Sequence, residues 1–164
     1  MNKDNEKILI RPLLEKDLDP VSKIESECFS MPWSKDSFRA LLENTDAYYV
    51  VAEVKDSGEI AGVCGLRKIL DEGDISNVAV KETFRNQGIG KALVREALTY
   101  AEKLHLSILT LEVRVSNAPA IALYESLHFE KVGIRPGFYE LPEEDALMMK
   151  WYNTILPWAN PHNA

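Results

Sequence analysis

The chain contains few residues of the kinds that form disulfides or metal sites, with two cysteines and three histidines among 164 residues. Cys28 and Cys64 lie in otherwise apolar stretches and do not form a Cys-x-x-Cys motif. We therefore expect buried, reduced thiols rather than a disulfide, a metal site or a nucleophile. His105, His128 and His162 show no ligand spacing with one another or with the cysteines. The sequence thus predicts no metal.

Long apolar runs are also absent. No stretch approaches the roughly 18 residues that a membrane-spanning helix requires, and the polar residues 1–7 lack a signal-peptide core. The composition has no repeat or biased segment, and 46% hydrophobic with 27% charged residues is typical of a globular protein. We expect a single domain over residues 1–164, with a core at 8–152 and a C-terminal tail at 153–164. These features favour a cytoplasmic protein with no membrane partner.

Basic residues are outnumbered: 19 lysines and arginines stand against 26 aspartates and glutamates, which gives a net charge of -7. Such a charge argues against general binding to nucleic acid, whose phosphates attract basic surfaces. It is compatible with a basic protein partner, although the same charge is also explained by solubility alone. The sequence leaves the oligomeric state open, with a monomer favoured.

Periodic apolar residues divide the chain into strands and helices. Runs of β-branched, aromatic or alternating residues predict strands at 8–13, 47–54, 60–69, 74–80, 107–115, 129–132, 134–139 and 146–152. Helical spacing predicts helices from Leu18, after Ser34, at 88–104 and at 120–127. Asp17, Ser34 and Asn117 are the expected N-terminal caps. The tail from Ile155 is expected to be irregular.

The most informative stretch joins the strand that ends at Val80 to the helix that follows, through Arg85-Asn86-Gln87-Gly88-Ile89-Gly90-Lys91. Gly88 and Gly90 allow positive φ and a close approach of a ligand to the backbone. The helix leaves its first N–H groups unpaired, and these donors, the helix dipole and Arg85 suit a phosphate or pyrophosphate. The alternative is a turn before a helix with no ligand.

Three phosphate-binding motifs compete for this loop. A Walker loop is excluded because Ala92 follows Lys91 where Ser or Thr is required. A dinucleotide-binding fingerprint is weakened by Leu93 at the third small position and by residues 81–87 between strand and glycines. It stays the second choice because Glu112 lies near the distance of a ribose-binding acid. The third motif, Arg-x-x-Gly-x-Gly after a Val-x-Val strand, resembles the acetyl-coenzyme A loop of the GNAT N-acetyltransferases.

Glu112 is a further candidate for chemistry. The strand at 107–115 follows a strand and a helix, so a right-handed parallel crossover places it beside or near the strand that ends at Val80. Alternation directs Thr110, Glu112 and Arg114 to one face. A central strand covered by helices has no solvated face, so the acid needs a partner or a wet cleft. The alternative is a structural ion pair with Arg114 or another base.

Four segments together closely resemble the RimI-type branch of the GNAT family, the ribosomal-protein-alanine N-acetyltransferases. They are Asp74 to Val80, Arg85 to Gly90, Leu111 to Arg114 and Ser116 to Glu125. The resemblance extends from the first strand to about Met149 and includes Pro32-Trp33-Ser34 and Glu144-Asp145-Ala146. It implies an α/β (α+β) GNAT fold. This fold has a mixed, mostly antiparallel sheet of six to seven strands, helices on both faces and a splayed pair of parallel central strands.

The resemblance also implies an activity and roles for individual residues. The acetyl group of acetyl-CoA would pass directly to the N-terminal alanine of a small-subunit ribosomal protein. The pantetheine arm and acetyl carbonyl would pair with the backbone of Val78, Ala79 and Val80. The pyrophosphate would lie on Arg85, Asn86, Gln87, Gly88, Ile89, Gly90 and Lys91. Asn117 would contact the cofactor, Glu112 would act as base and Tyr124 as acid.

The acceptor site has two readings. Trp33 and Tyr139 are expected to form walls of the acceptor site. For Trp33 the alternative is that its side chain packs into the core. Six acidic residues would attract a basic peptide, and the alternative is that they are solvated turn residues. They are Asp71, Glu72, Asp74, Glu140, Glu143 and Glu144. Two other functions remain open: a GNAT that acetylates a lysine, a polyamine or another small amine, and an idle coenzyme A-sensing module.

One position departs from the family's usual Leu-Gly-Phe after the tyrosine helix, because His128 stands in place of the glycine. Glycine suits a left-handed helix end, and histidine tolerates positive φ better than most residues but at some cost. The departure bears on local stability rather than on chemistry.

Overall fold

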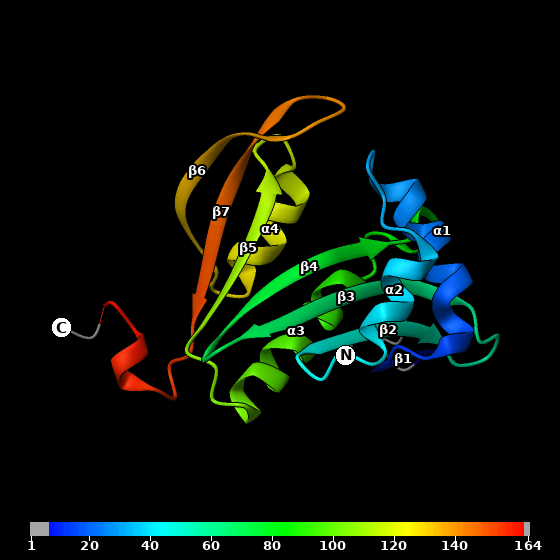
Figure 1. The fold of residues 1–164 in the computed structure, drawn as a ribbon, viewed down its shortest axis with the longest axis horizontal. Helices are drawn as coiled ribbons and strands as arrows, with labels where there is room; N and C mark the ends of the chain where they lie inside the picture. The colour runs from blue at the N-terminus through cyan, green and yellow to red at the C-terminus, as the bar shows by residue number, and fades with distance from the viewer. Residues whose placement is uncertain (1–6, 163–164) are drawn as a thin grey trace.

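A seven-stranded sheet organises the computed structural model, which describes residues 7–162. The strand order is β1-β2-β3-β4-β5-β7-β6, and neighbouring strands are antiparallel except for the parallel pair β4 and β5 (Figure 1). The strands are β1 (Ile8–Pro12), β2 (Ala47–Val54), β3 (Ile60–Ile69), β4 (Glu72–Val80), β5 (Ile108–Arg114), β6 (Glu130–Tyr139) and β7 (Glu144–Tyr152). The predicted parallel pairing of the two central strands is confirmed.

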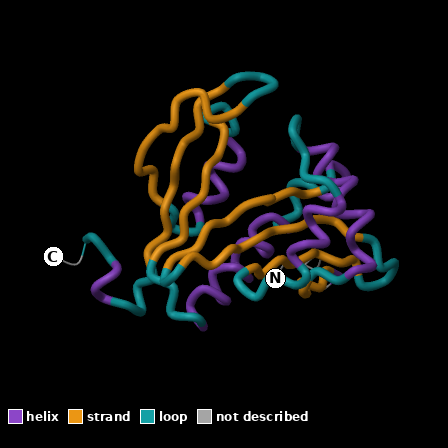
Figure 2. Tube along the Cα trace, in the orientation of Figure 1, coloured by secondary structure: helices purple, strands orange, loops and turns teal. Residues whose placement is uncertain are grey.

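Helices cover both faces of this sheet (Figure 2). They are α1 (Leu18–Cys28), α2 (Lys35–Leu41), α3 (Ile89–Lys103) and α4 (Ala118–Ser126). Neighbouring residues of β2 show the two layers, because successive side chains of a strand point to opposite faces. Val50 belongs to a core cluster with Leu93 of α3, whereas Val51 belongs to a second cluster with Val21 of α1 and Phe38 of α2.

The two parallel strands separate soon after they meet, and they form a V in Figure 1. Only Gly73 with Leu109 and Asp74 with Thr110 are paired. Further along β4, the register against β3 shifts next to Asn77, which has a left-handed φ of 57°. Such a bulge bends a strand, and asparagine tolerates this φ. Within residues 7–162, the β5-facing edge of β4 beyond Asp74 therefore has no strand partner.

Several element boundaries match the sequence-based expectation, and others differ. The strands predicted at 47–54 and 60–69 have these bounds. The strands predicted at 129–132 and 134–139 form the single strand β6. Gly133 does not end the strand, because it is accommodated at a register shift against β7.

Two of the three predicted helix caps are confirmed. Ser34 and Asn117 cap α2 and α4, each accepting a hydrogen bond from the backbone N–H three residues later, at 3.2 and 3.3 Å. Asp17 directly precedes α1, but its carboxylate does not cap that helix. It accepts from the Leu14 N–H at 2.9 Å and pairs with Arg11 at 2.7 Å. The prediction for Asp17 is therefore wrong, because a nearby arginine and an earlier turn take its oxygens.

The cysteines and the tail complete the fold. Both cysteines are free, and burial raises the pKa of Cys64 to about 12, whereas Cys28 is only half-buried. The prediction of a buried thiol is therefore confirmed for Cys64 and wrong for Cys28. The tail, predicted as irregular, contains a 3-10 turn over Pro157–Ala159 in which Ala159 is buried. In the described part of the chain, no helix combines the length and apolarity needed to span a bilayer.

Candidate active site

The glycine loop begins α3 from a left-handed residue. Gly88 stands at the N-cap position of the helix with φ 79°, and Asn86 before it has φ 62°. Gly90 lies inside the first turn of α3 and has no positive φ, so the positive φ predicted for this glycine is wrong. Its small size has a different reason, since a Cβ there would lie 3.1 Å from Leu123 Cδ1 of α4. Gly90 permits the close approach of α3 and α4.

A cavity of about 470 Å³ opens at this loop. Its walls come from the end of β4, the loop, the first turn of α3 and one side of α4. The residues that line it and were predicted to bind the cofactor are Val80, Arg85, Asn86, Gly88, Ile89, Gly90 and Lys91. Gln87, Asn117, Val78 and Ala79 are not among the lining residues. The cavity combines two cationic side chains with an apolar wall from α4, which suits a phosphate attached to an apolar chain.

Arg85 is held against the end of β4. Its Nε donates to the Val80 carbonyl at 3.1 Å, and Nη2 lies 3.5 Å from Cys28 Sγ. The thiol of Cys28 in turn lies 3.6 Å from the same carbonyl. The guanidinium is thereby positioned where β4 meets the glycine loop, and within residues 7–162 its Nη1 donors have no partner and can face an anion.

The β4 segment Val78 to Val80 leads into the cavity. One side is hydrogen-bonded to β3, where Val80 pairs with Gly62 and Ala79 with Val63. The Ala79 side chain is buried in the cluster beneath α1 and α2. On the other side β5 has already diverged. An extended ligand lying in the V would therefore meet a strand edge without a strand partner, on which the Val80 carbonyl is already bonded to Arg85.

Glu112 lies on β5, on the strand face that also carries Thr110 and Arg114. Its side chain is 25% exposed and lies 3.7 Å from Arg135 Nε, whose side chain is 52% exposed. The alternative of an ion pair is confirmed for another base, Arg135, and not for Arg114, which pairs with Glu144 at 3.3 Å. A distant pair between partly exposed groups contributes little stability. The Glu112 carboxylate is thus accessible to water.

Tyr124 is buried on α4 with 7% of its surface exposed, and its ring meets that of Phe129 edge-on at 5.8 Å. Burial raises the pKa of its hydroxyl above the ordinary value. Within residues 7–162, no hydrogen bond of this hydroxyl is present. The phenol is therefore a protonated donor with no fixed acceptor.

The two predicted acceptor walls have different environments. Trp33 is half-buried, with ring centroids 5.6 Å from Phe38 and 6.3 Å from Tyr49, so it packs at the edge of the second core cluster. Tyr139 lies at the end of β6 under the guanidinium of Arg114, at 4.5 Å from Cζ to ring centroid. Burial, together with the negative charge of Glu112, raises the pKa of Tyr139 to about 12. The charge of Glu112 therefore acts on the Tyr139 hydroxyl.

Sequence reasoning missed a buried polar group behind β4. Glu25 of α1 is 2% exposed, and its Oε1 accepts from Asn77 Nδ2 at 3.0 Å and from the Trp33 N–H at 3.4 Å. Asn77 Oδ1 accepts from the Tyr49 hydroxyl at 2.8 Å. A glutamate at an apolar-facing position of α1 was the only signal in the sequence, and the chain offered no local clue to its partners.

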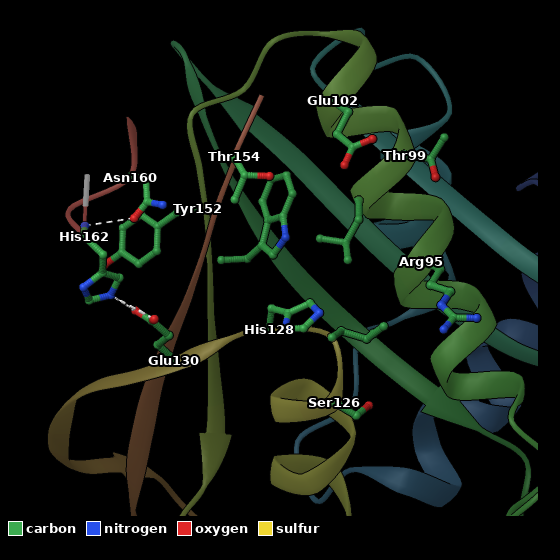
Figure 3. A pocket seen from close by; sticks show the side chains of 13 residues that line it. Arg95, Thr99, Glu102, Ser126, His128, Glu130, Tyr152, Thr154, Asn160 and His162 are labelled. Atoms are coloured by element: carbon green, nitrogen blue, oxygen red, sulfur yellow. Dashed lines mark hydrogen bonds and ion pairs between the residues drawn. The ribbon is translucent and has the colours of Figure 1, made fainter. Parts of the chain in front are cut away.

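A second cavity has a volume of about 570 Å³, and Figure 3 shows it from close by. It is bounded by the later turns of α3, the end of α4 and the tail, where His162 pairs with Glu130 at 2.9 Å. His128 lines it with a left-handed φ of 69°, as its place at the helix end predicts. Ser126 borders both cavities. None of the predicted site residues lines this second cavity, and in residues 7–162 no cluster of metal-ligand side chains is present.

Known proteins resemble this chain over most of its length. A protein from Bacillus subtilis (strain 168), named as a candidate [ribosomal protein bS18]-alanine N-acetyltransferase, is 42% identical over 144 residues, which are 87% of this chain and 94% of that protein. The [ribosomal protein bS18]-alanine N-acetyltransferase of Escherichia coli (strain K12) is 36% identical over 142 residues, 85% of this chain and 94% of the relative.

Structural and family-level comparisons agree with these relatives. The crystal structure of the ribosomal-protein-S18-alanine N-acetyltransferase from Escherichia coli superposes with a TM-score of 0.80 at 33% identity, covering 88% of this chain and 93% of that one. The family model of the acetyltransferase (GNAT) family matches residues 18–129. With its splayed parallel strands and glycine loop, this chain belongs to the GNAT acetyltransferase family.

Proposed function

We propose that the chain transfers the acetyl group of acetyl-CoA to the N-terminal α-amine of ribosomal protein bS18, at alanine, in the cytoplasm. The proposal is supported by the activity for which relatives 36–42% identical over most of the chain are named. It is also supported by the single observation on which the chemistry depends. Glu112 is carried by β5, the strand that diverges from β4, and its carboxylate is accessible to water.

Acetyl-CoA, the acetyl donor, would lie in the V between β4 and β5 in an extended conformation. The pantetheine arm would pair with the edge of Val78 to Val80 that β5 leaves uncovered, in the manner of an added strand, next to the Val80 carbonyl that already accepts from Arg85. The pyrophosphate would lie at the start of α3, where unpaired N–H groups, Arg85 and Lys91 supply positive charge. The left-handed Gly88 has nothing within 4 Å of an added Cβ, so the loop leaves open space for this ligand.

Acetyl transfer requires an unprotonated amine. The amine nitrogen attacks the thioester carbonyl carbon, a C–N bond forms, the C–S bond breaks, and the proton leaves the nitrogen for Glu112 through water. A protein α-amine with a pKa near 8 costs about 1 kcal/mol to deprotonate at pH 7, and a lysine near 10.4 costs about 4 to 5 kcal/mol. One partly exposed carboxylate is an adequate base for deprotonating the α-amine, and this favours an N-terminal acceptor over a lysine.

The departing thiolate of coenzyme A would meet the Tyr124 hydroxyl. A tyrosine and a thiol differ by roughly 1.5 pKa units in model peptides, so full proton transfer to the thiolate is uphill by about 2 kcal/mol. Burial raises the pKa of Tyr124 further and makes that transfer still less favourable. Tyr124 is therefore assigned as a hydrogen-bond donor that stabilises the developing thiolate.

The acceptor would enter past the acidic turns. Glu144 is engaged by Arg114 and by the Ser116 N–H at 2.7 Å, so it serves the protein's own structure. Glu140 and Glu143 are exposed and remain available to a basic peptide. A single copy of the chain carries all of these groups, and we propose that it acts as a monomer.

The test is an acetylation assay with two peptides. The first begins Ala-Arg, and the second has the same sequence with a blocked N-terminus and an added lysine. Acetylation of the first peptide alone supports the proposal. Acetylation of the second indicates a lysine or small-amine acetyltransferase, and binding of acetyl-CoA without any transfer indicates a sensing module. Either of these outcomes would reject the proposal.

A further inference from the structure

Two loops that are distant in sequence meet at one side chain. The α1–α2 loop comprises residues 29–34, and the β6–β7 loop comprises residues 140–143. The guanidinium of Arg114, on β5, donates to Ser30 Oγ at 3.4 Å and to the carbonyls of Glu140 at 3.1 Å and Pro142 at 2.9 Å. Ser30 Oγ also lies 3.3 Å from the Glu140 carbonyl. Arg114 therefore joins both loops to the strand that carries Glu112.

The remaining contacts fix the orientation of this guanidinium. Glu144 Oε1 lies 3.3 Å from Nη1, and the ring of Tyr139 lies 4.5 Å from Cζ. The side chains of Arg114 and Glu144 are 24% and 17% exposed. A planar fork with five N–H donors can satisfy several acceptors and a ring face together, which an ammonium group cannot do. These contacts depend on arginine rather than on positive charge alone.

The α1–α2 loop is also held from the other arm of the V. The Trp33 N–H donates to Glu25, which in turn accepts from Asn77 of β4. The end of the loop, at Trp33, is thus attached to β4 through Glu25 and Asn77. The start of the loop, at Ser30, is attached to β5 through Arg114. It bridges the two diverging strands at the side where α1 and α2 lie.

We propose that Arg114 is a positioning residue for the acceptor. It sets the separation of the α1–α2 and β6–β7 loops, and with it the place of Tyr139, so that an incoming α-amine reaches Glu112. Arg114 lies two residues after Glu112 on the same face of β5, so the position of the loops is tied to the position of the base. The proposal rests on the proposed function for the identity of the acceptor, but the joining of the loops is independent of it.

The test compares Arg114→Gln and Arg114→Lys with the control Arg39→Gln. Arg39 is an exposed arginine of α2 that pairs with Asp36 at 2.7 Å, away from the V. Hydrogen–deuterium exchange of the ligand-free protein is measured over residues 29–34 and 140–143. In both Arg114 variants we expect exchange in both loops to quicken by about fivefold or more, because local protection depends on these bonds. The control should match the wild type.

Kinetics with the Ala-Arg peptide form the second measurement. For Arg114→Gln we expect KM for the peptide to rise by about tenfold, as for the loss of charge-assisted hydrogen bonds, with the dissociation constant of acetyl-CoA within about twofold. A Ser30→Ala variant removes the bonds of Ser30 to Arg114 and to the Glu140 carbonyl but leaves Arg114 bonded to the β6–β7 loop. Its exchange should therefore quicken more in residues 29–34 than in residues 140–143.

Three results would overturn the inference. They are unchanged exchange in either loop of Arg114→Gln, quickened exchange with an unchanged peptide KM, and equal weakening of peptide and acetyl-CoA. If the wild type transfers no acetyl group to the peptide, the proposed function fails. The exchange data then still decide whether Arg114 holds the two loops.

Discussion

The Glu112 carboxylate lies 3.7 Å from Arg135 Nε, while Arg114, two residues along the same strand face, pairs with Glu144 instead. The base candidate therefore has a distant and half-exposed partner, and the neighbouring arginine is occupied elsewhere. This separation leaves the Glu112 carboxylate partly open to water, with room for an acceptor beside it.

Glu112→Gln should lower turnover most at low pH. An α-amine with a pKa near 8 is largely protonated at pH 7, where we expect about a tenfold or larger loss of kcat from the missing base. At pH 9 the amine is already neutral, so the loss should shrink. Steady-state kinetics from pH 6 to pH 9 measure this, and equal activity of variant and wild type at low pH would remove Glu112 as the base.

Tyr124→Phe should reduce kcat by about tenfold with little change in acetyl-CoA affinity, because the hydroxyl acts on the departing thiolate. Since burial raises the pKa of Tyr124, the hydroxyl stays protonated throughout an ordinary assay range. The wild type should therefore show no loss of activity from this group up to pH 10. Normal turnover of Tyr124→Phe would show that the Tyr124 hydroxyl does not stabilise the departing thiolate.

Gly88→Ala and Gly90→Ala should have different effects. Gly88 has a φ of 79°, so alanine there should cost about 1 kcal/mol of the free energy of unfolding, although nothing obstructs its Cβ. Gly90 is helical, and its added Cβ would press on the flexible end of Leu123 at 3.1 Å. Because alanine also favours the helix, we expect a smaller loss. Chemical denaturation measures both, and a larger loss for Gly90→Ala would contradict the structure.

Glu25→Gln should weaken the pH dependence of stability. Burial raises the pKa of Glu25 above its ordinary value of 4.5. In the interval above 4.5 the folded protein binds more protons than the unfolded chain, so this carboxyl destabilises the fold as pH rises. The stability of wild type relative to Glu25→Gln should therefore be greater at pH 5 than at pH 8. Urea denaturation at both values tests this, and the opposite order would show that Glu25 is stabilised as a carboxylate.

The sequence predicted the features that depend on local chemistry. The strands at 47–54 and 60–69 follow from β-branched runs around a turn, and the caps Ser34 and Asn117 follow from side chains that reach the first helical turn. The parallel placement of β5 beside β4 follows from the strand-helix-strand order. These elements were predictable because their partners lie within a few residues or obey a general rule of connection.

The features that depend on tertiary contacts were not predictable in the same way. Asp17 turns towards Arg11 instead of α1, and the base that pairs with Glu112, which the sequence left open, is Arg135 of β6. Gly90 is small because of α4 rather than because of its own φ. In each case a segment distant in sequence supplies the contact, and a single sequence does not specify where that segment lies.

The most direct measurement is a crystal structure of the protein with coenzyme A. The account predicts the pyrophosphate at Gly88, the pantetheine arm along Val78 to Val80, and the sulfur between β4 and β5 within hydrogen-bond distance of the Tyr124 hydroxyl. Coenzyme A bound in the second cavity, between α3 and the tail, or a sulfur remote from both Tyr124 and Glu112, would contradict it.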